Sequence, residues 1–180
     1  MEAGKREFAE RGLAGARFDE IAVAAGHAKG TIYNYFESKE ALFFAIVEEW
    51  CGLLGAAVDP HHPGTARERL LAIAALDVEV ARKDPDLARV VVQQTSALAG
   101  VHRVAVDEAI APGLDLLTAA IRAGLESGEF SSPHDAPTLA RLFLGVLSSF
   151  ELEALTASAV VELDDVVDLV DRHFVQGLSS

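Results

Sequence analysis

One segment, residues 10–42, constrains the fold of this chain more than any other. It contains four apolar side chains at the i, i+3, i+4 and i+7 spacing that places them on one face of a helix: Phe18, Ile21, Ala22 and Ala25. Gly26 follows at the position where helices commonly end in the left-handed conformation. Only two residues separate it from a second helical run, residues 29–36, so the spacing predicts a helix-turn-helix.

The second run can be placed on a helical wheel by rotating each position about 100° from the last. Ile32 and Phe36 then define the inward side. The opposite side and its flanks carry small, hydrogen-bonding or aromatic residues: Gly30, Thr31, Tyr33, Asn34 and Tyr35. Asparagine can pair with the edge of adenine, a threonine methyl can contact thymine, and tyrosine hydroxyls can reach phosphates. This helix is therefore predicted to enter the major groove of duplex DNA.

The next helix begins at a good N-cap residue, Ser38, and Lys39 adds a positive charge beside the free N–H groups. A phosphate is expected to bind there. Apolar residues recur every three or four positions along the helix: Leu42, Phe43, Ile46, Val47, Trp50, Leu53 and Leu54. The pattern predicts one long helix that leads out of the DNA-reading segment into the rest of the chain.

These motifs resemble the DNA-binding domain of TetR-family bacterial transcriptional regulators. The matching residues are Glu10-Arg11-Gly12, Ile21-Ala22, Ala25-Gly26, Lys29-Gly30-Thr31-Ile32-Tyr33, Phe36 and Ser38-Lys39-Glu40-Ala41-Leu42. By position, the resemblance implies that the DNA-facing residues are Arg17, Lys29, Gly30, Thr31, Tyr33, Asn34, Tyr35 and Lys39. Arg17 and Ala28 stand where the family usually has small hydroxyl residues as N-caps. Losing a side-chain cap costs about 1 kcal/mol, so both helices are expected to depend more on packing.

Helical periodicity continues through the rest of the chain, with helix starts at Thr65, Asp84 and the segment 132–137. We therefore predict an all-α protein of about nine helices. A three-helix helix-turn-helix DNA-binding domain is expected in residues 1–47. The resemblance implies that a helical ligand-binding and dimerisation domain follows in residues 48–180.

Four residues are predicted walls of a ligand pocket: Trp50, Gln94, His102 and Phe143. Trp50 ends the helix that the resemblance makes the link between ligand and DNA, but it equally suits an ordinary core. Gln94 could orient a ligand or face solvent, and His102 could donate to a ligand or be structural. The apolar stripes contain no fixed cations, which favours a neutral, hydrophobic effector.

The last two helices are predicted to form a dimer interface, with six residues facing the second copy: Leu142, Val146, Phe150, Val166, Val170 and Phe174. Gly145, Ser148 and Ser149 would allow close approach. The resemblance implies a four-helix interface between two subunits. A homodimer also suits DNA recognition, because two recognition helices held about 34–36 Å apart can read a palindrome.

The net charge of −13 is unevenly distributed. Residues 1–40 contain 6 Lys and Arg against 7 Asp and Glu, whereas residues 41–180 contain 9 against 21. An acidic body would repel DNA everywhere except at the recognition surface, or it is simply a solvated acidic surface. No apolar run has the length of a membrane span and no signal segment opens the chain, so a cytoplasmic protein is expected.

Other chemistry is expected to be absent. The single cysteine, Cys51, cannot form an internal disulfide and suits a core. Asp59, His61 and His62 are near neighbours in a turn-rich loop and would point in different directions, so no metal or cofactor is predicted. The chain also lacks a nucleophile-and-base pair and a phosphate loop, so it is not expected to be an enzyme.

The pattern as a whole favours a ligand-responsive transcriptional regulator. We expect a repressor that a small hydrophobic effector releases from a palindromic, double-stranded DNA operator. The alternative is a helical ligand-binding or interaction module with weak or lost DNA binding, which the acidity and the two absent caps would suit.

Overall fold

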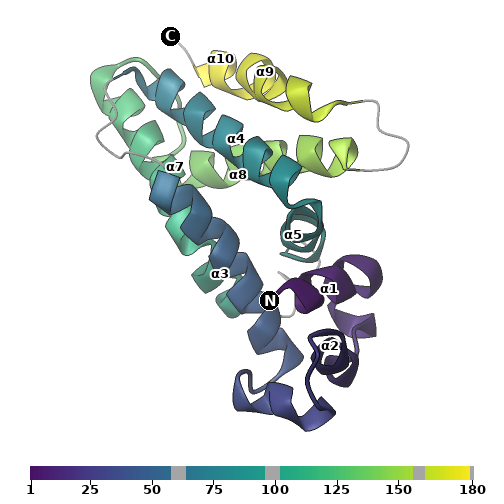
Figure 1. Ribbon diagram of the computed structural model, residues 1–180. Helices are drawn as coiled ribbons and strands as arrows, with labels where there is room; N and C mark the ends of the chain where they lie inside the picture. Colours follow the sequence, from purple (N-terminus) through teal and green to yellow (C-terminus); the bar gives the residue numbers. More distant parts are fainter. Residues whose placement is uncertain (58–63, 96–101, 156–160, 179–180) are drawn as a thin grey trace. The chain divides into compact units, whose positions relative to one another are not determined.

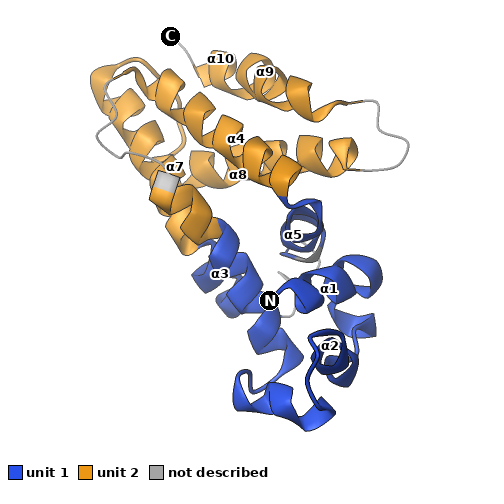
Figure 2. Cartoon of the chain, viewed as in Figure 1, with its two compact units in different colours: residues 1–50, 84–110 blue, residues 51–83, 111–180 orange. Residues whose placement is uncertain are grey.

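A computed structural model describes residues 1–57, 64–95, 102–155 and 161–178 (Figure 1). The regular elements in these ranges are nine α-helices and four short 3₁₀ or π segments, which confirms the all-α prediction. In the same ranges, no helix combines the length and the apolar character that a membrane span requires. The chain forms two compact units, residues 1–50 with 84–110 and residues 51–83 with 111–180 (Figure 2).

Unit 1 contains the helix-turn-helix and one later segment of the chain, residues 84–110. Its elements are α1 (Glu2–Gly15), α2 (Phe18–Ala24), η1 (Lys29–Asn34), the first part of α3 (Lys39–Ala57), α5 (Pro85–Arg89), η2 (Val90–Gln94) and the start of α7 (Arg103–Ser127). Phe8 of α1 and Phe43 of α3 are fully buried and pack edge to face, with ring centroids 5.8 Å apart. α5 and η2 pack against α1, which is why residues 84–110 group with the N-terminal segment.

The backbone of unit 1 bears on two helices of the N-terminal segment. The predicted division after residue 47 falls inside α3, which continues unbroken to Ala57, as the prediction of one long helix requires. In α1 the backbone turns to φ 64° and ψ 173° at Gly12, and one further helical turn follows to Gly15. A φ of this sign is strained for any residue with a Cβ atom, so Gly12 allows the kink.

Unit 2 contains the remaining helices. They are α4 (Ala66–Lys83), the rest of α3 and α7, α8 (Ala136–Ala154), η3 (Leu163–Asp165), α9 (Val166–Val170), η4 (Asp171–Val175) and α10 (Gln176–Leu178). α9 packs against both α4 and α8. Pro112 lies within α7, which runs from Arg103 to Ser127 as one helix. Residues 163–178 are helical without a break, and the π segment η4 lies between α9 and α10.

Local sequence signals mark the helix starts correctly. The Thr65 amide donates to Glu68 Oε2 at 2.8 Å, and the Glu68 amide donates to Thr65 Oγ1 at 3.1 Å, which is the reciprocal capping box that the sequence predicts. The Leu87 amide donates to Asp84 Oδ1 at 3.0 Å, so Asp84 caps α5. These bonds satisfy backbone N–H groups that have no partner within the helix.

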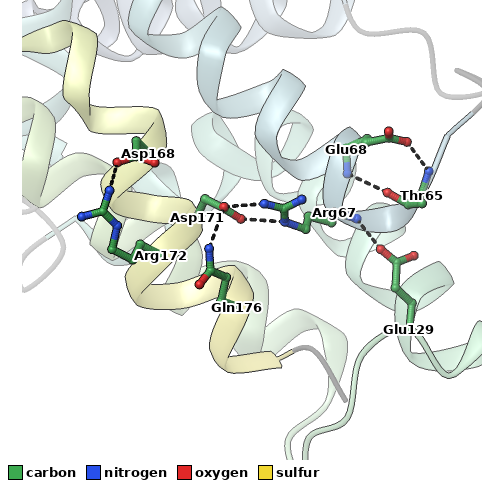
Figure 3. Close-up of polar contacts among 8 residues, drawn as sticks. All are labelled: Thr65, Arg67, Glu68, Glu129, Asp168, Asp171, Arg172 and Gln176. Atoms are coloured by element: carbon green, nitrogen blue, oxygen red, sulfur yellow. Dashed lines mark hydrogen bonds and ion pairs between the residues drawn. The ribbon is translucent and has the colours of Figure 1, made fainter.

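Side chains from distant parts of unit 2 gather at the start of α4 (Figure 3). The Glu129 carboxylate accepts from the amides of Ala66 at 2.7 Å and Arg67 at 2.9 Å. The Arg67 guanidinium donates to both oxygens of Asp171, at 2.9 and 2.6 Å, and Gln176 donates to the same carboxylate at 3.1 Å. The hydrogen bond from Arg67 lowers the pKa of Asp171. These bonds fasten η4 and α10 to the N-terminus of α4.

Candidate DNA-binding interface

The turn of the helix-turn-helix is a helix C-terminal motif closed by Gly26. Its backbone adopts φ 80°. The Gly26 amide donates to Val23 O at 3.0 Å and the His27 amide donates to Ala22 O at 2.9 Å. This pair of bonds is the Schellman arrangement, which requires a left-handed residue at this position. The prediction of a turn at Gly26 is confirmed.

The inward face of α2 is shorter than expected. Phe18, Ile21 and Ala22 are buried. Ala25 is exposed, so its predicted inward position is wrong. The reason is that α2 ends at Ala24, and Ala25 already has the non-helical φ and ψ of −81° and 1°.

The second helix is the 3₁₀ segment η1, which ends at Asn34 rather than continuing to residue 36. Ile32 is buried and Phe36 is half-buried, as the wheel predicts. The residues predicted to point outward are largely exposed: Lys29, Gly30, Tyr33, Asn34 and Tyr35. Thr31 is half-buried, so it is less exposed than the wheel predicts.

Tyr33 is held against α2. Its ring packs edge to face on Phe18, with centroids 5.0 Å apart and planes 89° apart. The side chain nevertheless remains 56% exposed, and Tyr35 is 71% exposed. Both tyrosines therefore keep surface that can contact DNA. The contact between Phe18 and Tyr33 could not be recognised from spacing alone, since it joins two different helices.

The structure confirms that α2 and η1 begin without a side-chain N-cap. Neither Arg17 nor Ala28 makes a side-chain capping bond. At the start of α2 a carboxylate from α1 takes this role, because the Arg17 amide donates to Glu7 Oε1 at 3.2 Å. The Arg17 guanidinium is exposed and lies 3.7 Å from Glu20 Oε1, so its charge is partly compensated.

Lys39 makes two backbone contacts that the resemblance does not imply. Its ammonium donates to the carbonyl oxygens of Ala14 at 3.2 Å and Ala16 at 3.3 Å. Ser38 caps α3 as predicted, accepting from the Ala41 amide at 3.1 Å. Lys39 thus ties the start of α3 to the junction between α1 and α2. These two bonds use two of the three N–H donors of the ammonium and leave its charge uncompensated.

The predicted pocket residues are distributed over both units. Trp50 is buried in unit 1, and His102 is half-buried there, its ring 6.3 Å from that of Phe44. Phe143 is fully buried in unit 2. The side chain of Gln94 is outside the described residues. A hollow of about 230 Å³ behind η1 contains none of the four in its wall. The ligand pocket therefore stays a prediction.

The predicted dimer residues fall into two groups. Leu142 is 50% exposed, and Val146 and Phe150 are half-buried on the same helix, α8. Val166 and Val170 are fully buried within the single chain, so they have no surface to offer a second copy. Half-buried Phe174 packs edge to face on the ring of Phe143, 5.5 Å away. Of the six predicted residues, Leu142, Val146, Phe150 and Phe174 keep surface that a second copy could contact, and Gly145 on α8 is exposed.

Metal ligands are not assembled in the part of the chain that the structure describes: no group of three or more His, Cys, Asp or Glu side chains could hold an ion there. Asp59, His61 and His62 lie outside the described residues. The Cys51 side chain is buried.

Comparison with known proteins agrees with this geometry. Residues 1–46 match the family model "Bacterial regulatory proteins, tetR family", and residues 63–151 match "Tetracyclin repressor-like, C-terminal domain". The fatty acid metabolism regulator protein of Bacillus subtilis is 26% identical over 172 residues, covering 94% of this chain and 86% of the relative.

Two solved structures have the same fold. The fatty acid degradation regulator FadR from Bacillus halodurans has a TM-score of 0.85 at 24% identity, covering 98% of this chain and 96% of that one. FadR from Bacillus subtilis, in complex with stearoyl-CoA, has a TM-score of 0.79 at 23% identity, covering 94% of each chain. The chain belongs to the TetR family of bacterial regulatory proteins and is a ligand-responsive, DNA-binding transcriptional regulator.

Proposed function

We propose that this regulator is a homodimeric repressor that reads a palindromic operator with η1. The observation that carries the proposal is the orientation of η1. Ile32 holds it against α2, while Gly30, Asn34 and Tyr35 remain exposed on the other side. A small outer strip lets the backbone approach the bases, and an exposed asparagine can make two hydrogen bonds with adenine.

Cations contribute little to this surface. Of the eight predicted DNA contacts only Arg17, Lys29 and Lys39 are cationic, and the charge of Arg17 is partly compensated by Glu20. Each phosphate that a cation neutralises adds to the salt dependence of DNA binding. Operator affinity is therefore expected to depend weakly on salt, and recognition to rest on the neutral side chains of η1.

Dimerisation is proposed through α8. Leu142, Val146 and Phe150 supply apolar surface on one helix, and Gly145 permits close packing. Two copies related by a twofold axis would present the same surface to each other. One η1 reads only a few base pairs, whereas a symmetric pair spaced by one turn of DNA reads a palindrome.

The proposed effector carries a long apolar chain. The support comes from the Bacillus subtilis relative, whose structure contains stearoyl-CoA and which matches nearly the whole of this chain. The segments of unit 2 contain 7 Lys and Arg against 15 Asp and Glu, which favours a neutral head group over an anionic one. Coupling of about 1–3 kcal/mol between effector and operator would reduce operator occupancy appreciably. Release of labelled operator by stearoyl-CoA and by a neutral stearoyl ester compares the two head groups.

The substitution Asn34→Ala tests whether η1 recognises DNA bases. An operator duplex is selected by the wild-type protein from a random-sequence pool. Removing the amide should weaken binding to it by about 1–3 kcal/mol and relax the base preference at one position of each half-site. Binding of singly substituted duplexes measures this preference.

Lys29→Ala is the matched control on the same segment. It removes a charge rather than a base contact, so it should weaken all duplexes alike. An unchanged base preference in Asn34→Ala would contradict the orientation proposed for η1. If the wild type selects no sequence at all, the alternative gains support: a ligand-binding module without DNA binding, which the engagement of Lys39 by backbone carbonyls would suit.

A further inference from the structure

Lys5 of α1 is a buried cation surrounded by three carboxylates. Its side chain is 3% exposed. The ammonium lies 2.8 Å from Glu2 Oε1, 3.0 Å from Glu49 Oε1 and 2.9 Å from Asp84 Oδ2. Removing an ammonium from water is costly, and close carboxylates are what make its burial tolerable. Three of them around one ammonium is more than charge neutrality requires.

The three partners differ in where they come from. Glu2 lies on α1 itself, one helical turn from Lys5. Glu49 lies on α3 two positions before Cys51, where the chain passes into unit 2 (Figure 2). Asp84 is the residue at which the chain returns to unit 1, and its other oxygen caps α5. Two of the three ion pairs of Lys5 are therefore made with residues next to positions where the chain crosses between the units.

We propose that Lys5 is a latch that holds α1, and with it the helix-turn-helix, in a fixed orientation against α3 and the start of α5. The inference rests on the proposed function, since the orientation matters when two copies of η1 must meet two half-sites together. Lys5 acts as a positioning residue and does not contact DNA. Movement of either Glu49 or Asp84 away from the ammonium releases the latch.

Loss of the latch has a specific consequence for DNA binding. The helix-turn-helix of each subunit, here called its head, can still bind one half-site. Simultaneous engagement of two half-sites suffers, because the effective concentration of the second head falls when its orientation is no longer fixed. Loss of the latch is thus distinguishable from damage to the reading surface, which would weaken both kinds of binding equally.

The test compares Asp84→Asn and Glu49→Gln with wild type on two duplexes, without any effector. One duplex is the selected palindrome, and the other is the same duplex with one half-site scrambled. Asn remains a good N-cap, so Asp84→Asn removes the charge while keeping the cap of α5. Each variant should weaken binding to the palindrome by about tenfold, part of the 10²–10⁴ that linking two sites provides, and leave half-site binding within about twofold.

Glu2→Gln is the matched control. It removes a carboxylate equally close to the ammonium, but one that lies on the same helix and ties Lys5 to no other element. It should leave binding to both duplexes unchanged. Equal weakening of both duplexes in the test variants, no weakening, or an equal effect of Glu2→Gln would overturn the latch. A wild type that does not distinguish the two duplexes would overturn the proposed function and the latch with it.

Discussion

The two units bury charge in opposite ways. In unit 1, Lys5 is buried as a cation among carboxylates that keep some contact with solvent: the side chains of Asp84 and Glu49 are 27% and 38% exposed. In unit 2, Asp77 of α4 and Glu151 of α8 are both almost fully buried, and one oxygen of Glu151 has no hydrogen-bond partner among the described residues. The buried charged site of unit 2 thus consists of two neighbouring carboxyl groups, whereas that of unit 1 combines an ammonium with carboxylates.

The two sites shift the pKa values of their central groups for different reasons. Burial lowers the pKa of Lys5, but hydrogen bonds to Glu2, Asp84 and Glu49 outweigh it and raise the pKa above its ordinary value of 10.5. Burial, and then the nearby Asp77 carboxylate, raise the pKa of Glu151 well above its ordinary 4.5. Unit 1 thus contains a buried cation, whereas in unit 2 burial and a neighbouring carboxylate favour the protonated form of Glu151.

The largest effect is expected from Lys5→Met, which removes the cation from the first site. Three carboxylates would remain close together without an ammonium. The free energy of unfolding should fall by about 3 kcal/mol, at the low end for a broken buried pair because the carboxylates can turn toward water. Urea denaturation at pH 7 measures the change. Glu2→Gln should cost much less, as exposed ion pairs do, and equal losses would contradict the central place of Lys5.

A smaller effect, but one confined to unit 2, is expected from pH. Because the folded pKa of Glu151 is raised, the folded chain binds a proton that the unfolded chain has released above pH 4.5. The free energy of unfolding should therefore fall as pH rises from 4.5 toward the folded pKa, by up to about 1.4 kcal/mol per pH unit from this group. Denaturation at a series of pH values should show this slope, and Glu151→Gln should flatten it.

Lys5 provides the contrast in the same experiment. A raised lysine pKa gives stability that is fully present below 10.5 and is lost only as pH rises through the folded value. Lys5→Met should therefore lower stability by the same amount across the range from pH 5 to pH 8. If the slope survived in Glu151→Gln, another group would be holding the proton, and the comparison between the units would fail.

The smallest effect is expected from Arg67→Met, which breaks an ion pair at the surface of unit 2. The Arg67 side chain is 45% exposed, so solvent screens its bonds to Asp171. A decrease of about 1–2 °C in the melting temperature at pH 7 is expected. Because Arg67 lowers the pKa of Asp171, the contribution is present above the ordinary value of 3.8 and is lost as pH falls below it. A difference from wild type that persisted at pH 2 would contradict this origin.

Interactions between residues close together in the sequence were predicted correctly. The cap at Ser38, the box formed by Thr65 and Glu68, the cap at Asp84 and the turn at Gly26 all agree with the structure. Each depends on backbone groups within five residues, so the local sequence contains both partners. The outward side of η1 was predicted for the same reason, although Thr31 is half-buried.

The family resemblance implies that Lys39 contacts DNA, and the structure adds two hydrogen bonds from Lys39 to backbone carbonyls. Residues at the same positions imply the same contacts only if the surrounding chain leaves the side chain free. Here the carbonyls of Ala14 and Ala16 occupy its ammonium, and these groups lie 25 and 23 residues away. The burial of Val166 and Val170 is similar: periodicity identifies an apolar face, but not whether another helix of the same chain covers it.

The sequence by itself determined the helices, their caps, the turn before η1 and the family, because hydrogen bonds between near neighbours and the period of apolar residues fix them. Only the tertiary structure decided which charges meet. Lys5 lies 44 and 79 residues from Glu49 and Asp84, and Ala66 lies 63 residues from Glu129. Such pairs form only where packing of apolar surfaces has already brought distant helices together, and no local pattern encodes that meeting.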